Sequence, residues 1–172
     1  MNDTEPVGAV PDYEYVTYIG ATAERVWHAL TDAEKTGRFW GHAQVSDWKA
    51  GSRVEHVRTD GSGIADAAGT VHEVDAPHRL SFGFGDPAGA DRPLAEQSLV
   101  TFQLEQFRDI VKLSITQTRI PTAVDRAAVA EGWPTVLANL KTLLETGDVL
   151  PTPPWEFHSV QRAAQLLQHD EQ

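Results

Sequence analysis

Residues 125–147, DRAAVAEGWPTVLANLKTLLETG, carry the pattern that decides the fold of this chain. Apolar side chains recur there at spacings of three and four residues, which places them on one face of a helix. They are Val129, Trp133, Val136, Leu137, Leu140 and Leu144. Gly147 suits the end of this helix, because glycine readily adopts a left-handed C-cap conformation. Pro134 leaves two alternatives open: a kink in one long helix, or a main helix that starts just before the proline.

The residues before this helix predict one strand, two short helices and then a run of strands. Residues 13–19 are rich in aromatic and β-branched side chains, which is typical of a strand. Thr22 and Asp32 suit the N-caps of short helices over residues 23–30 and 33–39. Further strands are predicted over residues 44–48, 52–58, 65–74, 79–84, 97–106 and 110–119. Their short connections favour an antiparallel meander, and their alternating pattern favours one buried face.

The long apolar helix and the half-buried sheet predict an α+β fold. We expect a curved antiparallel sheet of six to seven strands, wrapped around the long C-terminal helix, with two short helices after the first strand. The predicted organisation is a flexible arm over residues 1–12, a domain over 13–148, and a Pro-rich linker with a tail helix over 149–172. The tail helix needs an apolar partner, either its own domain or a second copy of the chain in a homodimer.

Composition excludes several classes of function. The 172 residues include 25 acidic and 14 basic ones, so the formal net charge is -11. Such a surface repels phosphate backbones and anionic lipid, which argues against nucleic-acid binding and membrane docking. The chain has no cysteine, so disulfides and thiolate chemistry are excluded. The N-terminus does not resemble a signal peptide, and no apolar stretch approaches the roughly 18 residues of a membrane span, so we expect a cytoplasmic protein.

Three strings, in the right order and spacing, carry a resemblance to a known family. They are residues 19–31 (IGATAERVWHALT), 69–82 (GTVHEVDAPHRLSF) and 132–147 (GWPTVLANLKTLLETG). Together they resemble the activator of heat-shock-protein-90 ATPase homologue-like family, of the START-like (SRPBCC) superfamily. The chain departs from it at Phe84, where the family usually has tryptophan, and at Gln117, where histidine is common. The resemblance implies the helix-grip fold; relatives include a co-chaperone, binders of lipids, polyketides or hormones, and a few polyketide cyclases.

The candidate site is a cavity between the sheet and the long helix. Its predicted apolar wall consists of Trp27, Trp40, Phe82, Phe102, Trp133 and Leu137, although large aromatic residues commonly just fill a core. Trp40 is the leading candidate, since it follows the second short helix near the expected mouth. Strand parity places His56, Arg58 and Gln117 inward, where they would orient a ligand; the alternative is that each bonds to neighbouring strands. The seven histidines lack metal-ligand spacing, and we expect no metal and no cofactor.

Three functions follow from this site. The first is binding of a small apolar or amphipathic molecule inside the cavity. The second is a cyclase- or aromatase-like enzyme that uses His56 or Arg58 for proton transfer, although the sequence contains no recognisable catalytic constellation. The third is an interaction module like the co-chaperone, for which an exposed apolar patch would be the sign.

Overall fold

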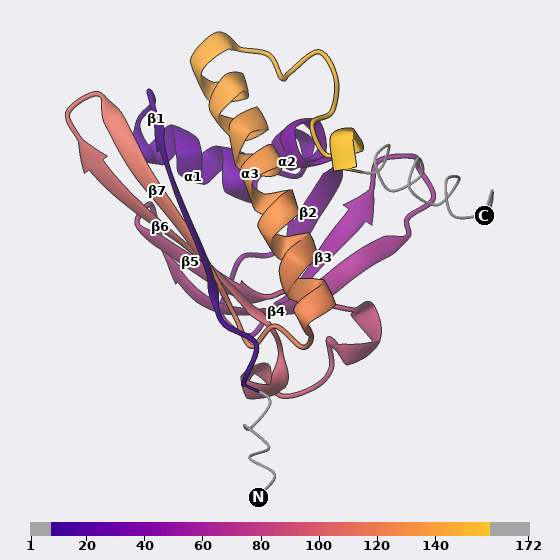
Figure 1. Ribbon diagram of the computed structural model, residues 1–172. Coiled ribbons are helices and arrows are strands. Elements are labelled where there is room, and N and C mark those ends of the chain that lie inside the picture. The colour runs from indigo at the N-terminus through magenta and orange to yellow at the C-terminus, as the bar shows by residue number, and fades with distance from the viewer. Residues whose placement is uncertain (1–7, 159–172) are drawn as a thin grey trace, which may run out of the picture.

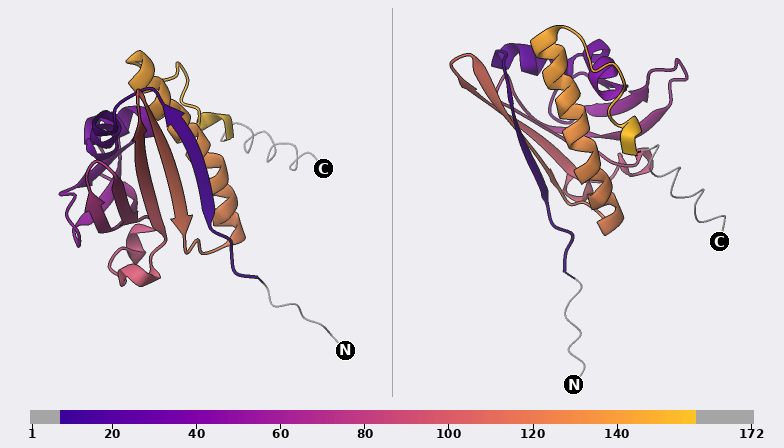
Figure 2. Two further views of the ribbon diagram at one scale, coloured as in Figure 1. Left: turned by 90° about the vertical axis from the view of Figure 1, so that its left-hand side faces the viewer. Right: turned by 45° about the horizontal axis from the view of Figure 1, so that its top comes forward.

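A computed structural model of the protein describes residues 8–158. Seven antiparallel strands form one curved sheet in the order β1-β7-β6-β5-β4-β3-β2, and the long helix α3 lies across its concave side (Figures 1 and 2). The strands are β1 (Tyr13–Ile19), β2 (His42–Ser46), β3 (Arg53–Arg58), β4 (Ala65–Asp75), β5 (Arg79–Gly83), β6 (Leu99–Phe107) and β7 (Ile110–Thr118). The helices are α1 (Ala23–Thr31), α2 (Ala33–Trp40) and α3 (Ala123–Thr146). The predicted fold class is therefore confirmed.

The two short helices begin and end where the sequence places their caps. The side chain of Thr22 accepts a hydrogen bond from the backbone NH of Arg25, and that of Asp32 accepts one from Lys35. Gly41 ends α2 at a φ of 80°, a left-handed conformation that glycine adopts without strain. The indole of Trp155 lies directly against Gly41, so a larger residue at position 41 would clash with it.

The long helix α3 is continuous through Pro134, so the alternative that it starts just before the proline is wrong. Its N-cap is Thr122, whose side chain accepts a hydrogen bond from the NH of Asp125, and Gly147 ends it at a φ of 86°. From Trp133 onward it is buried against the sheet through the predicted stripe, including Leu137 and Leu140. Residues 123–132 are exposed or only partly buried, and Val124 is 80% accessible to solvent.

The buried side chain of Asn139 ties three segments of the chain together. Its amide nitrogen donates to the carbonyl of Phe39 at the end of α2 (3.1 Å), and its oxygen accepts from the NH of Leu150 (2.8 Å). These bonds satisfy backbone groups that would otherwise be buried without partners. They hold α2 and the chain after α3 in fixed positions beside the middle of α3.

Several predicted boundaries differ from the structure by one or two residues; β6, for example, begins at residue 99 rather than 97, and α3 begins at 123 rather than 125. Strand β2 spans residues 42–46 rather than 44–48, and Trp48 instead sits in the following turn at a φ of 53°. The loop over residues 85–95 contains a short 3-10 turn, Pro87–Gly89, and a second one, Leu94–Glu96, follows it. The predicted arm and tail helix lie largely outside the described residues. Between residues 8 and 158, no helix is long and apolar enough to span a membrane.

The packing of β4 on β5 requires glycine at position 69. A Cβ atom built there would lie 1.9 Å from the carbonyl oxygen of Gly83, whereas one built on the nearby Gly85 would meet nothing within 4 Å. We expect Gly69→Ala to lower the free energy of unfolding by about 2 to 3 kcal/mol, because two backbones must separate. Urea denaturation measures this, with Gly85→Ala as the matched control. Equal stabilities of the two variants would contradict the close approach.

Candidate ligand site between α3 and the sheet

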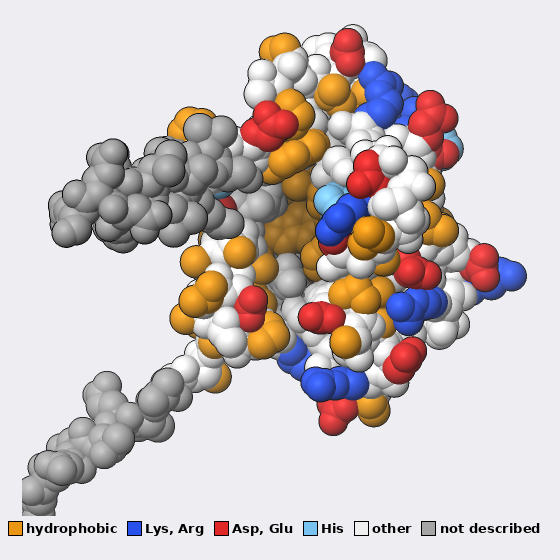
Figure 3. All heavy atoms as spheres, turned by 90° about the vertical axis from the view of Figure 1, so that its right-hand side faces the viewer, with side chains coloured by type: hydrophobic (Ala, Val, Ile, Leu, Met, Phe, Trp, Pro, Cys, Tyr) orange, Lys and Arg blue, Asp and Glu red, His pale blue; other side chains and the backbone are white. Residues whose placement is uncertain are grey.

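Two adjoining pockets open beneath the first half of α3. The larger, of about 410 Å³, lies between the chain around residues 84–98 and the start of α3, and we call it the loop pocket. The smaller, of about 230 Å³, is the tryptophan pocket, lined by Trp40, Phe84, Gln117, Ala128, Val129, Gly132, Trp133 and Val136. The two pockets share Phe84, Gln117, Ala128 and Val129. Figure 3 looks at the side of the molecule between α3 and strands β2 to β4 and shows a hollow with a hydrophobic floor.

The tryptophan pocket is built from aromatic rings that contact one another. The ring centroid of Trp40 lies 5.0 Å from that of Trp133 and 5.8 Å from that of Phe84. Trp40 reaches this position as the last residue of α2, Phe84 follows β5, and Trp133 lies where α3 first becomes buried. Three separate segments therefore supply one apolar wall, which suits an apolar guest.

Gln117 is a polar residue that lines both pockets, and the nitrogen and the oxygen of its amide are each hydrogen-bonded. Its oxygen accepts a hydrogen bond from the indole NH of Trp133 (2.9 Å), and its nitrogen donates to the hydroxyl of Ser98 (3.0 Å). Ser98 in turn donates to the carbonyl of Thr118 (3.0 Å). This chain of bonds holds the Trp133 ring in one orientation.

The loop pocket is held in shape by Gln97. Its amide nitrogen donates to the carbonyls of Ala90 and Arg92, and its oxygen accepts from the NH of Thr70. A single buried side chain thus ties the loop before β6 to strand β4. Arg92 and Glu96 bring charged groups to the lining of this pocket.

His56 lies behind the wall of the tryptophan pocket and does not line it. Its ring centroid is 4.8 Å from that of Trp40 and 5.3 Å from that of Phe84, and its other face stacks on His42 at 4.1 Å. Burial, together with the neighbouring His42, lowers the pKa of His56 to about 3. The imidazole is therefore neutral at physiological pH and is a weak base there.

Arg58 does not share the interior with His56, contrary to the expectation from strand parity. Its guanidinium is partly exposed at the end of β3 and forms a two-pronged hydrogen bond with Asp66. Asp66 also bonds Nε2 of His42 at 2.8 Å, and the hydrogen bonds from Arg58 and then His42 lower its pKa. The pairing of β3 with β4 is irregular beside Asp66, which brings this carboxylate within reach of both partners.

The structure brings together only part of the predicted site. Trp40, Gln117 and Trp133 line the tryptophan pocket, with His56 directly behind it. Phe82, Phe102 and Leu137 are fully buried core residues that line neither pocket. Trp27 is partly buried on α1 and also lines neither one.

Two residues at this site escaped the sequence-based prediction. Phe84 continues the alternation of Leu80 and Phe82, which marks it as inward-facing, yet the predicted wall omits it. Gln44 is buried beside His56, and its polar side chain offered no local sign of burial. In residues 8–158 no group of three or more His, Asp or Glu side chains is arranged to hold a metal ion.

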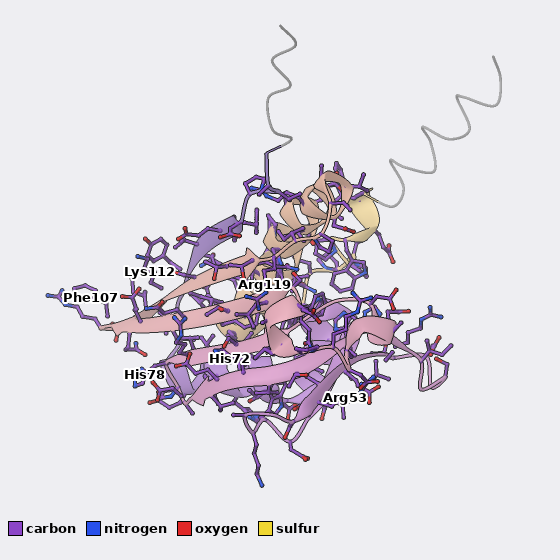
Figure 4. All side chains as sticks on the ribbon, turned by 90° about the horizontal axis from the view of Figure 1, so that it is seen from below. Arg53, His72, His78, Phe107, Lys112 and Arg119 are labelled. Atoms are coloured by element: carbon purple, nitrogen blue, oxygen red, sulfur yellow. The ribbon has the colours of Figure 1, made fainter. Side chains whose placement is uncertain are left out.

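The buried His56 makes stability depend on pH. The unfolded chain takes up a proton near pH 6.5 and the folded protein only near pH 3, so stability is fully present above pH 6.5 and falls as pH drops through that window. Between pH 6.5 and 4.5, His56 makes the free energy of unfolding of the wild type fall by up to about 1.4 kcal/mol per pH unit. We expect His56→Phe to lack this contribution, so its free energy of unfolding should fall less steeply. Urea denaturation at several pH values measures the slope, with His72→Phe, at an exposed histidine on the outer face of the sheet (Figure 4), as control. Identical slopes for wild type and His56→Phe would contradict a neutral, buried His56.

Comparison with known proteins agrees with this architecture. The sequence model of the family described as "Activator of Hsp90 ATPase homolog 1-like protein" matches residues 20–145. Comparison with curated protein sequences finds no significant match.

Several solved structures share the fold. The Aha1 dimer from Colwellia psychrerythraea is 20% identical, with a TM-score of 0.64 over 80% of this chain and 98% of that one. PFC0360w, an HSP90 activator from Plasmodium falciparum, is 21% identical, with a TM-score of 0.61 over 77% of this chain and 95% of that one. CalU16 from Micromonospora echinospora is 20% identical, with a TM-score of 0.61 over 79% of this chain and 77% of that one.

At these identities the solved structures show a common fold alone. The family match is independent of them and spans well over half of the residues, including the strings around α1, β4 and α3. The chain therefore belongs to the Activator of Hsp90 ATPase homolog 1-like family and has the START-like helix-grip fold of that family.

Proposed function

We propose that this protein binds a small, largely apolar molecule in the tryptophan pocket and the adjoining loop pocket. The observation that carries this proposal is the cluster of Trp40, Phe84 and Trp133 around a hollow that the chain itself leaves unfilled. Pockets of a few hundred Å³ with mainly apolar walls are typical sites for small ligands. The charged groups at the loop pocket, among them Arg92 and Glu96, suit the more polar end of an amphipathic molecule.

Gly132 offers a way to fill the tryptophan pocket without disturbing the fold. It lines this pocket from α3, and a Cβ built on it meets no atom within 4 Å. Gly132→Leu therefore places a side chain into the hollow, and replacing glycine inside a helix favours folding by up to about 1 kcal/mol. Ala127→Leu, at an exposed position of the same helix that lines neither pocket, is the matched control.

We expect native mass spectrometry of the protein purified from its own cells to show a bound small molecule. The added mass should persist in Ala127→Leu and be lost in Gly132→Leu, while the melting temperature of Gly132→Leu equals or exceeds that of wild type. Retention of the same molecule by Gly132→Leu would place its site elsewhere. A wild-type protein that carries no molecule and whose tryptophan fluorescence does not respond to naphthalene derivatives would contradict the proposal.

The cyclase-like alternative has less support than ligand binding. Arg58 is engaged by Asp66 outside the pockets, and His56 is screened from them by Trp40 and Phe84. A general base works best when its pKa lies near the working pH, and the pKa of His56 is about 3.

A protein-interaction function is a second candidate because apolar side chains are exposed at the hairpin between β6 and β7. Phe107 and Ile110 pair across the hairpin and are 65% and 40% exposed, and Tyr18 on the neighbouring β1 is 54% exposed. Figure 4 shows Phe107 projecting from the tip of this hairpin. Such an apolar projection suits contact with another protein.

The relative from Plasmodium falciparum is described as an HSP90 activator, which gives this candidate a direct assay. If the protein acts in this way, it should stimulate the ATPase of heat-shock protein 90 from the same organism. The variant Phe107→Ser/Ile110→Ser should lose at least about tenfold of that stimulation, since exposed apolar anchors carry much of an interface's energy. Gly132→Leu serves as the control that leaves the hairpin intact, and an absence of stimulation by wild type would exclude this candidate.

The Colwellia psychrerythraea relative was solved as a dimer. A homodimer of the present chain through residues 149–172 stays a prediction. Its test is light scattering of the full chain against a chain that ends at His158, a point chosen so that the contact of Trp155 with Gly41 is kept.

A further inference from the structure

The side chain of Gln44 is buried on the concave side of β2 with no hydrogen-bond partner. It is 1% exposed, and neither its amide oxygen nor its amide nitrogen is bonded. Its backbone NH, in contrast, donates to the hydroxyl of Thr36 (2.9 Å), so the strand itself is well anchored. An unpaired buried amide lowers the stability of the fold by about 1 to 3 kcal/mol. Its presence at this position therefore needs an explanation, such as a partner that the chain itself does not supply.

His56 lies directly opposite Gln44 and also has an unpaired polar atom. The two residues are Cα partners in the antiparallel pairing of β2 with β3, and both side chains are buried on the same face. Nδ1 of His56 is buried and has no hydrogen-bond partner. Directly opposed side chains on one face lie about 5 Å apart at Cβ, so one small polar group can reach both.

A thin aromatic wall separates His56, the strand partner of Gln44, from the tryptophan pocket. Trp40 and Phe84 line this pocket, and the same two rings contact the imidazole of His56. The indole NH groups of Trp133 and Trp48 are held by hydrogen bonds to Gln117 and to the carbonyl of Thr31. The indole NH of Trp40 makes no such bond with any residue in the described part of the chain, so aromatic contacts alone hold its ring in place.

We propose that the Gln44 amide and the His56 imidazole form a polar subsite behind Trp40, which receives a neutral hydroxyl or carbonyl group of the bound ligand when the Trp40 ring turns aside. This inference rests on the proposed function and narrows the ligand class to apolar molecules that carry an uncharged oxygen, such as alcohols, phenols or ketones. Gln44 supplies both a donor and an acceptor, and the neutral imidazole supplies one or the other at Nδ1.

A carboxylate does not suit this subsite. Gln44 is uncharged and burial keeps His56 neutral, so neither side chain balances a buried negative charge. The nearest cation on β3, Arg58, is already bonded to Asp66 (2.7 Å). His42, which stacks on His56, is bonded to the same carboxylate. The chain as a whole carries a formal charge of -11, which further disfavours an anionic ligand.

Three probes that share a naphthalene ring test whether the subsite prefers a neutral oxygen: naphthalene, 2-naphthol and 2-naphthoate. Isothermal titration calorimetry at pH 7.5 should show 2-naphthol binding about tenfold more tightly than naphthalene, since a hydrogen bond to a buried, otherwise unpaired group adds to the apolar contact. 2-Naphthoate should bind at least about tenfold more weakly than 2-naphthol. In NMR spectra, the indole NH signal of Trp40 should shift on addition of 2-naphthol, while that of Trp48 stays in place.

Two variants remove the polar atoms and keep the shape of the site. His56→Phe retains a ring against Trp40 and Phe84, and Gln44→Leu retains the volume of the side chain. Each should bring the affinity ratio of 2-naphthol to naphthalene close to one and leave naphthalene affinity within about twofold of wild type. Gln44→Leu should also raise the melting temperature of the ligand-free protein, because it removes an unpaired buried amide.

The outcomes distinguish this inference from the proposed function. Equal affinity of wild type for naphthalene and 2-naphthol, or tightest binding of 2-naphthoate, would overturn the polar subsite and leave apolar ligand binding intact. Variants that melt earlier and keep the wild-type affinity ratio would show that Gln44 and His56 serve only the fold. Failure of all three probes to bind would contradict the proposed function and this inference together.

Discussion

Burial of one face of α3 against the concave side of the sheet is the interaction on which the rest of the structure depends. A seven-stranded sheet with an apolar face needs a cover of similar length, and α3 is the only described helix long enough to provide it. The contact is concentrated in the second half of the helix, where Leu137 and Leu140 are almost completely buried. Each such side chain contributes roughly 1.5 to 3 kcal/mol through apolar burial.

The pockets are a consequence of this uneven contact. Before Trp133, the residues of α3 are exposed or only partly buried, so the sheet beneath this part of the helix is covered incompletely. Trp40, Phe84 and Trp133 line the space that remains, and the bond from Trp133 to Gln117 fixes one side of it. The same helix thus stabilises the fold at one end and leaves room for a ligand at the other.

Polar groups in the interior fall into two kinds, those with hydrogen-bond partners and those without. Asn139, Gln97 and Gln117 are buried and bonded at both ends of their amides, so they hold segments of the fold in place. Gln44, Nδ1 of His56 and Oγ of Ser81 are buried and unbonded. Of these, Gln44 and His56 lie opposite each other on neighbouring strands, and His56 contacts the wall of the tryptophan pocket. Because unbonded buried polar groups destabilise a fold, their presence at this place is better explained by a partner that arrives with the ligand.

Local patterns in the amino-acid sequence account for most of the fold. Periodicity located α3 and nearly all of the strands, and caps such as Thr22 and Gly147 marked helix ends, because these signals depend on neighbours a few residues apart. Strand parity and helix periodicity also placed Gln117 and Trp133 correctly on the concave side.

The detail of the site required the folded chain. Strand parity predicts that Arg58 faces the same way as His56. In the structure Arg58 lies at the end of β3, where an irregularity in the pairing with β4 brings Asp66 within hydrogen-bonding distance. The unpaired state of Gln44 depends on β3, which lies opposite it, and on the absence of any other hydrogen-bonding group within its reach in the described residues. The shape of the pockets depends on how far α3 stays in contact with the sheet. These features arise from contacts between residues that are far apart in sequence. The local spacing of residues does not specify which distant residues come into contact.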